Sequence, residues 1–184
     1  VYGINNWIRG FSKKLAKQNI PILALPLYGR TAPKLDLGYN EEDLNLGRYH
    51  KNLTTSKNII KDVSAAINWV KEKYPQKKIS IIGFCFGGYA ALIASSLKGI
   101  ESTFCFYGAG VITPRPDNNF APIDLIGKVS GKLNFICGSS DDLIPLGDRL
   151  EIKKRFKKVD PLEERFFYIE VEGADHGFMC EERE

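Results

Sequence analysis

The 184-residue sequence predicts a single α/β domain built on a mostly parallel sheet. Short apolar runs alternate four to five times with segments whose apolar residues recur at helical spacing. The apolar runs are nearly continuous, which is typical of strands buried on both faces of a parallel sheet. No internal repeat or linker-like segment divides the sequence, so residues 1–184 are expected to form one domain.

The chain is expected to begin with a helix and a buried strand. Residues 4–19 predict a helix that Asn5 or Asn6 caps. Residues 20–25 form a short apolar run bounded by prolines, which predicts a buried strand. The first helix is predicted from an apolar stripe at helical spacing, made of Trp7, Ile8, Phe11 and Leu15.

A long polar stretch follows, reaching to about residue 52, and shows little periodicity. A connection of that length without secondary structure is often functional, so a binding role is expected there. The next helix begins at Thr55 or Ser56 and stops at Tyr74, because proline at position 75 cannot continue it.

The second half of the chain continues the alternation of strands and helices. A loop rich in Pro, Asn and Gly is expected at residues 108–130. Strands are expected at 79–82, 103–107, 133–137 and 165–171, and helices at 86–97 and 146–156.

The charge pattern is ordinary for a globular protein. The net charge of +4 arises from 26 basic and 22 acidic residues, and most lysines fall on predicted helices. Solvated helix faces explain these lysines, and no base-stacking aromatic pattern accompanies them, so nucleic acid is not an expected partner. The longest apolar runs are far below about 18 residues, which argues against a membrane span.

The four cysteines, Cys85, Cys105, Cys137 and Cys180, are scattered and form no C-x-x-C pair. Three of them lie in apolar, strand-like surroundings, and no signal peptide opens the sequence. This usage predicts reduced thiols in a cytoplasmic protein, not a disulfide framework.

Residues 81–92 (IIGFCFGGYAAL) have the layout of a nucleophile elbow, G-x-S-x-G, with Cys85 in the place of serine. Gly83 and Gly87 are expected to remove Cβ atoms where the strand and helix backbones approach closely. The turn would place Cys85 at a helix N-terminus, where the dipole favours a thiolate. The backbone N–H of Phe86 is then an expected oxyanion donor.

Two further candidates follow the expected strands in the order nucleophile, acid, histidine. Asp141 comes after the third of these strands and His176 after the last. His176 is expected to exchange the proton of Cys85, and Asp141 is expected to fix the tautomer of His176.

Each member of this triad has an alternative. A lone cysteine after a strand is usually a small buried residue, but the paired glycines favour a functional Cys85. Asp142 and Asp175 compete with Asp141 for the role of the acid, and the G-S-S-D-D segment also fits a helix-capping turn. His50 lies in the long polar stretch and in the wrong chain order.

With these motifs in place, the sequence resembles the dienelactone hydrolase family, in which cysteine is the usual nucleophile. The matching phrases occur in family order along nearly the whole chain. They are residues 2–9 (YGINNWIR), 25–30 (LPLYGR), 83–88 (GFCFGG), 106–108 (FYG), 138–141 (GSSD) with 144–145 (IP), and 173–178 (GADHGF).

The resemblance implies a three-layer α/β-hydrolase-like sandwich and a Cys85–His176–Asp141 triad that opens activated esters or lactones through an acyl-enzyme. It implies no metal or organic cofactor. It places a second oxyanion N–H at Val1, directly after a glutamate that takes part in activating the cysteine. The sequence starts after that glutamate and lacks the family's N-terminal strands and C-terminal helix, so an internal portion of a longer chain is expected.

The substrate-binding residues depart from the family pattern. Family members that cleave dienelactone hold the substrate carboxylate with arginines, and one of these lies four residues after the catalytic histidine. Cys180 occupies that position here. Arg48 and Tyr107 are the remaining substrate-binding candidates, although a solvated surface arginine is the favoured interpretation of Arg48.

The leading hypothesis is therefore a carboxylic ester hydrolase of the carboxymethylenebutenolidase type, acting on a small ester or lactone as a monomer or homodimer. Two alternatives stay open. One is a non-catalytic hydrolase-like domain that binds a small molecule or a protein, and the other is a thioesterase.

Overall fold

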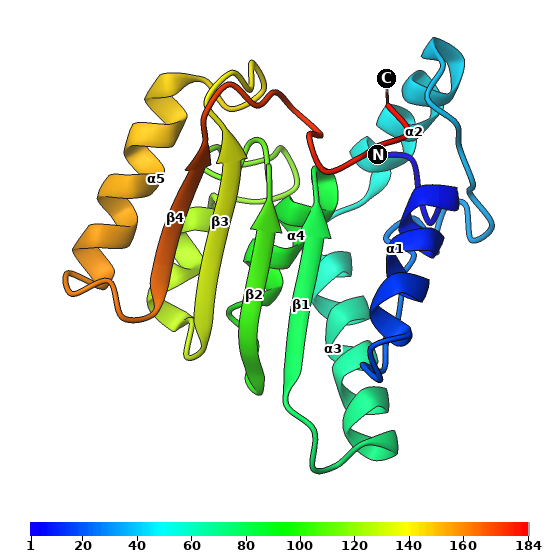
Figure 1. The fold of residues 1–184 in the computed structure, drawn as a ribbon, viewed down its shortest axis with the longest axis horizontal. Coiled ribbons are helices and arrows are strands. Elements are labelled where there is room, and N and C mark those ends of the chain that lie inside the picture. Colours follow the sequence, from blue (N-terminus) through cyan, green and yellow to red (C-terminus); the bar gives the residue numbers. More distant parts are fainter. Residues whose placement is uncertain (184) are drawn as a thin grey trace.

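Four parallel strands form one sheet in the order β1-β2-β3-β4 (Figure 1). The computed structural model describes residues 1–183. All four strands predicted for the second half of the chain are present, which confirms the α/β class. Their bounds are β1 (Ile79–Phe84), β2 (Ile100–Phe106), β3 (Lys132–Gly138) and β4 (Phe166–Val171).

Helices lie on both faces of this sheet, unevenly distributed (Figure 1). On one face α4 contacts β1 and β2, α5 contacts β4, and α3 packs on α4. On the other face α1 packs its Trp7 and Phe11 rings against Phe84, with ring centroids 4.8 and 5.1 Å apart. The helices are α1 (Asn6–Ala16), α2 (Glu41–Leu53), α3 (Ser56–Lys73), α4 (Phe86–Ala94), α5 (Leu146–Val159) and the 3-10 helix η1 (Pro122–Lys128).

Capping residues set the starts of α1 and α3 as the sequence predicts. Asn5 accepts a hydrogen bond from the backbone N–H of Ile8 at 3.2 Å. Thr55 does the same for Asn58 at 3.2 Å, and so supplies one of the partners that a helix N-terminus lacks. The third helix ends at Lys73, two residues before Pro75.

The central helix α4 supplies the middle of the core. Its residues are apolar on all sides, and every one except Gly87 is buried, including Leu92 and Ile93 with no exposed surface. A helix of this kind needs cover all round, and it receives this from β1, β2, α3 and η1. Because α4 begins directly after Cys85, the packing of this helix also fixes the position of Cys85.

The strand predicted at residues 20–25 is wrong. This segment has no regular secondary structure, and Ile20 and Leu23 are 48% and 47% exposed. Hydrophobicity alone predicted the strand, but a strand also needs a neighbour to accept and donate backbone hydrogen bonds. Within residues 1–183 β1 pairs only with β2, and no strand lies along its other edge.

The two long loops predicted from the sequence each contain a helix. The polar stretch before residue 52 contains α2, whose N-cap Asn40 accepts from the Asp43 N–H at 2.8 Å. Few apolar residues lie in α2, so hydrophobic periodicity does not reveal it. The loop at 108–130 contains η1, which packs on α4 and α5. No helix within residues 1–183 has both the length and the hydrophobicity needed to cross a membrane.

Candidate active site

Cys85 occupies a strained turn between β1 and α4. Its backbone has φ 54° and ψ −117°, a region that residues with a Cβ rarely adopt. Two hydrogen bonds hold it there: the Cys85 N–H donates to the Phe106 carbonyl at 3.0 Å, and the Cys85 carbonyl accepts from the Tyr89 N–H at 3.1 Å. The sheet and the helix therefore jointly hold the thiol at the carboxyl edge of the sheet.

Gly83 allows this turn to form, as predicted. A Cβ at Gly83 would lie 1.9 Å from the Gly87 carbonyl oxygen, so only glycine fits. The expectation for Gly87 is wrong, since a Cβ there would meet nothing within 4 Å. The second close approach is at Gly88, where a Cβ would lie 2.6 Å from the Phe106 oxygen. The spacing of the motif marks the turn correctly but does not show which glycine touches which backbone.

The structure brings Asp141 and His176 together beside the elbow. Asp141 follows β3 and His176 follows β4, and the Asp141 Oδ2 lies 2.9 Å from the His176 Nδ1. The Asp141 side chain has no exposed surface, and its Oδ1 accepts from the Leu143 N–H at 2.9 Å. Both competing carboxylates, Asp142 and Asp175, are exposed. Of the three candidate carboxylates, Asp141 is therefore the one in contact with the imidazole.

The other nitrogen of His176 is directed to the cysteine. The buried Nε2 has no hydrogen-bond partner of regular geometry within residues 1–183, and the nearby thiol of Cys85 interacts with the imidazole. Catalytic hydrogen bonds are often long without substrate, so this arrangement is compatible with proton transfer. His50 lies on α2 and bonds Thr31 through Nδ1 at 3.0 Å, outside the triad.

Charge interactions shift the two titrating groups in opposite directions. Burial raises the pKa of the Cys85 thiol, but the His176 hydrogen bond, the imidazolium charge and the Phe86 N–H outweigh it and lower the pKa to about 6. Burial lowers the pKa of His176, but hydrogen bonds to Asp141 and Cys85 raise it to about 9. A thiolate–imidazolium pair is therefore favoured between these two values.

The two expected oxyanion donors both lie at the thiol. The Phe86 N–H lies close enough to the Cys85 sulfur to lower the pKa of the thiol. The nitrogen of Val1 is buried and lies close enough to interact with the same sulfur. If the carbonyl carbon of a substrate were bonded to the Cys85 sulfur, its oxygen would lie within reach of the Phe86 N–H and the Val1 nitrogen.

The two weaker substrate-binding candidates have different surroundings. Tyr107 is only 2% exposed, and its ring centroid lies 5.2 Å from that of His176 and 5.3 Å from that of Phe178. Its ring therefore supports the imidazole and offers almost no surface to a ligand. Arg48 is exposed on α2 and makes no hydrogen bond or ion pair with the site residues described.

Sequence reasoning missed two contacts at the edge of the site. Arg183 donates to the His176 carbonyl at 3.3 Å, and its guanidinium lies 5.9 Å from the centroid of the Tyr2 ring. Cys180, which replaces the arginine expected from the family pattern, lies 3.1 Å from the Tyr39 hydroxyl. No local motif marks either contact: the Tyr39–Cys180 and Tyr2–Arg183 pairs join segments far apart in the sequence, and the contact of Arg183 with His176 depends on the path of the chain after His176.

Comparison with known proteins identifies the family. The model of the dienelactone hydrolase family matches residues 1–184. The chain belongs to the dienelactone hydrolase family. This membership agrees with the resemblance found in the sequence and with the predicted class, a carboxylic ester hydrolase.

Two relatives illustrate how similar the chain is to other members of the dienelactone hydrolase family. A Synechocystis protein named "Putative carboxymethylenebutenolidase" is 33% identical over 185 residues, covering 100% of this chain and 74% of its own length. The carboxymethylenebutenolidase of Pseudomonas putida is 23% identical over 180 residues, covering 97% of this chain and 71% of its own length.

Solved structures support the same fold. A Klebsiella pneumoniae crystal structure described as "Putative Dienelactone Hydrolase" has a TM-score of 0.81 at 16% identity, covering 97% of this chain and 73% of that chain. A dienelactone hydrolase-like promiscuous phosphotriesterase from metagenomic libraries has a TM-score of 0.64 at 17% identity, covering 96% and 68%. At these identities the structures show the α/β-hydrolase-like fold alone.

We predict that Gly83→Ala and Gly87→Ala differ sharply in stability. The Gly83 variant should lose more than about 2 kcal/mol of unfolding free energy, because its Cβ would overlap the Gly87 carbonyl. The Gly87 variant should stay within about 1 kcal/mol of the parent, because its Cβ enters open space in a helix that favours alanine. Urea unfolding measures both, and equal losses would contradict the turn geometry.

We also predict that iodoacetamide labels Cys85 well before Cys105 and Cys137. Below pH 6 the Cys85 thiol is protonated, so its labelling rate should fall about tenfold per pH unit; above about pH 7 the rate should level off. Burial raises the pKa of Cys105 and of Cys137, which keeps both unreactive.

Peptide mass spectrometry across pH 4–9 measures these rates. Substituting His176→Ala should move the rise in Cys85 labelling to higher pH, since the group that favours the thiolate is removed. The matched control, His50→Asn, should leave the profile in place. Equal labelling of all three cysteines in the parent would rule out an activated Cys85.

Proposed function

We propose that the protein hydrolyses a small activated ester or lactone with Cys85 as nucleophile, His176 as general acid and base, and Asp141 as the group that orients the imidazole. The observation that carries the proposal is the 2.9 Å Asp141–His176 contact, with the free Nε2 of His176 beside a thiol on a strained elbow. A nucleophile, a base and an orienting acid in series form a triad.

In the first half of the proposed reaction, the Cys85 thiolate attacks the carbonyl carbon of the substrate. The carbonyl oxygen gains negative charge and is stabilised by the Phe86 N–H and the nitrogen of Val1. The carbon–oxygen single bond of the ester then breaks, and protonated His176 donates its proton to the leaving oxygen. The product is a thioester of Cys85; in a lactone the new hydroxyl stays attached to the acyl group.

In the second half, neutral His176 removes a proton from water, and the resulting hydroxide attacks the thioester carbon. The bond from carbon to sulfur breaks and Cys85 returns to the thiolate, which protonated His176 stabilises. Asp141 keeps the Nδ1 proton of His176 in place, so that Nε2 is the atom that exchanges protons with substrate and water.

The proposed substrate is a small lactone or ester that bears a carboxylate. The names of two relatives, both carboxymethylenebutenolidases, support a lactone. Arg183 is exposed at the edge of the site, where its charge acts on the buried phenol of Tyr107, and this cation suits a substrate carboxylate. The four cysteines are free, which supports the proposal of a cytoplasmic enzyme.

We predict that Cys85→Ala lowers kcat/KM for p-nitrophenyl acetate at least about 10³-fold, because the acyl-enzyme cannot form. Asp141→Asn should lower it about 10²- to 10⁴-fold, since the amide would hold His176 in the wrong tautomer. Steady-state kinetics and a burst of one p-nitrophenolate per subunit are the measurements.

The matched controls are Asp142→Asn and His50→Asn, which alter exposed or remote groups and should leave kcat/KM within about twofold of the parent. Circular dichroism verifies that each variant is folded. Unchanged turnover in folded Cys85→Ala would overturn the nucleophile assignment. An absence of turnover by the parent with any activated ester would favour the non-catalytic alternative.

A further inference from the structure

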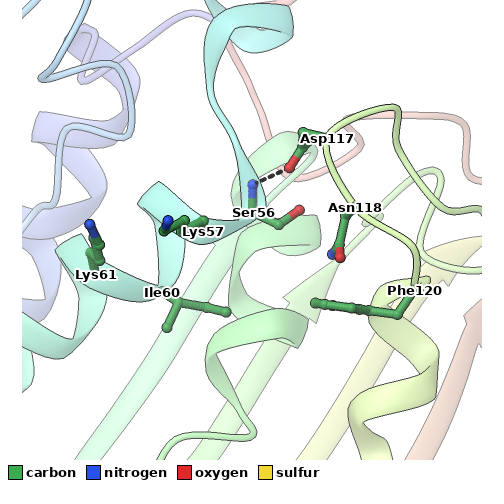
Figure 2. A pocket seen from close by; sticks show the side chains of 7 residues that line it. All are labelled: Ser56, Lys57, Ile60, Lys61, Asp117, Asn118 and Phe120. Atoms are coloured by element: carbon green, nitrogen blue, oxygen red, sulfur yellow. Dashed lines mark hydrogen bonds between the residues drawn. The ribbon is translucent and has the colours of Figure 1, made fainter.

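A cavity of about 340 Å³ lies away from the triad, between the first turns of α3 and the loop that leads to η1 (Figure 2). Figure 2 shows Ile60 of α3 and Phe120 of the loop facing each other across it, with Ser56 and Asn118 at one end. None of the residues that line it belongs to the elbow or the triad. Its size is in the range of small-ligand sites.

Unpartnered polar groups gather around this cavity. Seven buried side-chain nitrogen or oxygen atoms within residues 1–183 have no hydrogen-bond partner. Four of these seven atoms belong to residues in or next to this cavity. Since buried polar atoms are normally hydrogen-bonded, such a concentration indicates hydrogen-bonding capacity that the protein itself does not use. The four atoms are the Ser56 Oγ, the Tyr89 hydroxyl, the Arg115 Nη1 and the Asn118 Nδ2.

The side chain of Ser56 faces the cavity and can form a hydrogen bond there. The residue is only 2% exposed and its hydroxyl lines the cavity wall. Its neighbour on the core side is the phenol of Tyr89. The two hydroxyls can share one hydrogen bond in either direction, and in the arrangement in which Tyr89 donates, the proton of Ser56 is free for another acceptor. The cavity is the place from which an acceptor can reach it.

The only carboxylate lining the cavity is already engaged. The backbone N–H of Ser56 donates to the Asp117 Oδ2 at 2.7 Å, and the Asp117 Oδ1 lies 3.3 Å from the Nε of Arg115 (Figure 2 shows the first contact). The helix N-terminus is therefore capped, and the negative charge of Asp117 is compensated. The groups left over, Ser56 Oγ and Asn118 Nδ2, are donors.

Two lysines add positive charge at the same cavity. Lys57 and Lys61 line it from α3, one helical turn apart, and both are exposed. Neither makes an ion pair with a carboxylate within residues 1–183. The donors Ser56 and Asn118, the two lysines of α3 and the apolar walls formed by Ile60 and Phe120 together define the chemistry that a ligand of this cavity needs.

We propose that this cavity binds a carboxylate with a small apolar body, such as an aromatic or short aliphatic acid. The carboxylate accepts from Ser56 and Asn118 and lies in the field of Lys57 and Lys61, while the apolar body packs between Ile60 and Phe120. The site is separate from the ester-cleaving centre and does not depend on the function proposed for Cys85.

Isothermal titration of benzoate into protein whose Cys85 has been blocked with iodoacetamide tests the proposal, because the triad is then unable to react. We expect one saturable site per chain. The neutral isostere benzamide should bind about tenfold more weakly or worse, since it lacks the charge that the donors and lysines favour. Raised salt should weaken benzoate binding.

Three variants localise the site. Ser56→Ala removes the hydroxyl but keeps the backbone N–H that bonds Asp117, and should raise the Kd for benzoate about tenfold. Lys57→Gln should raise the Kd and reduce its salt dependence. The matched control, Lys154→Gln on α5, removes an equally exposed lysine elsewhere and should leave the Kd unchanged.

Amide NMR spectra verify the folding of each variant and should show benzoate-dependent shifts at Ser56, Asn118 and Phe120. The absence of saturable binding up to about 10 mM benzoate would show that ordered water alone satisfies these donors, and would overturn the proposal. Binding that Ser56→Ala and Lys57→Gln leave unchanged would place benzoate elsewhere and would overturn it equally.

Discussion

The contact between the backbones of residues 83 and 87 is the constraint on which the site depends. The Gly83 Cα approaches the Gly87 carbonyl so closely that no Cβ fits between them. This approach lets the chain reverse from β1 into α4 within one residue, and that residue, Cys85, takes the positive φ. Burial of α4 on all sides stabilises the turn, so the core of the protein supports the strain at Cys85.

The parallel sheet brings the remaining groups to the same place. Parallel strands end at one edge, so the loops after β1, β3 and β4 meet there although they lie far apart in the sequence. Asp141 is fixed by the Leu143 N–H and in turn fixes His176. Tyr107, held with φ 38° after β2, packs its ring against the imidazole. The segments after β2, β3 and β4 thus supply Tyr107, Asp141 and His176, and the first two of these residues both contact the imidazole of His176.

Electrostatic interactions between Cys85 and His176 shift the pKa values of both groups toward their charged forms. Burial by itself opposes a thiolate at Cys85 and an imidazolium at His176. Their mutual attraction, together with Asp141, reverses both effects, so each charge is stable only because the other is present. The cavity at Ser56 is different in kind: its charge comes from exposed lysines and its donors from buried side chains, and α4 separates it from the sheet.

The sequence by itself determined the α/β class, the four strands of the sheet, the elbow at Cys85 and the order of Asp141 and His176. These follow from local signals: apolar runs, capping residues, and glycines spaced around a turn. Residues 20–25 and helix α2 were misjudged because hydrophobicity reports burial and not pairing, and because a polar helix has weak periodicity. Only the tertiary structure decided which glycine touches which backbone, which of three carboxylates reaches His176, and that Arg183 lies beside the site. Each of these depends on distances that the path of the folded backbone sets and that spacing along the sequence does not reveal.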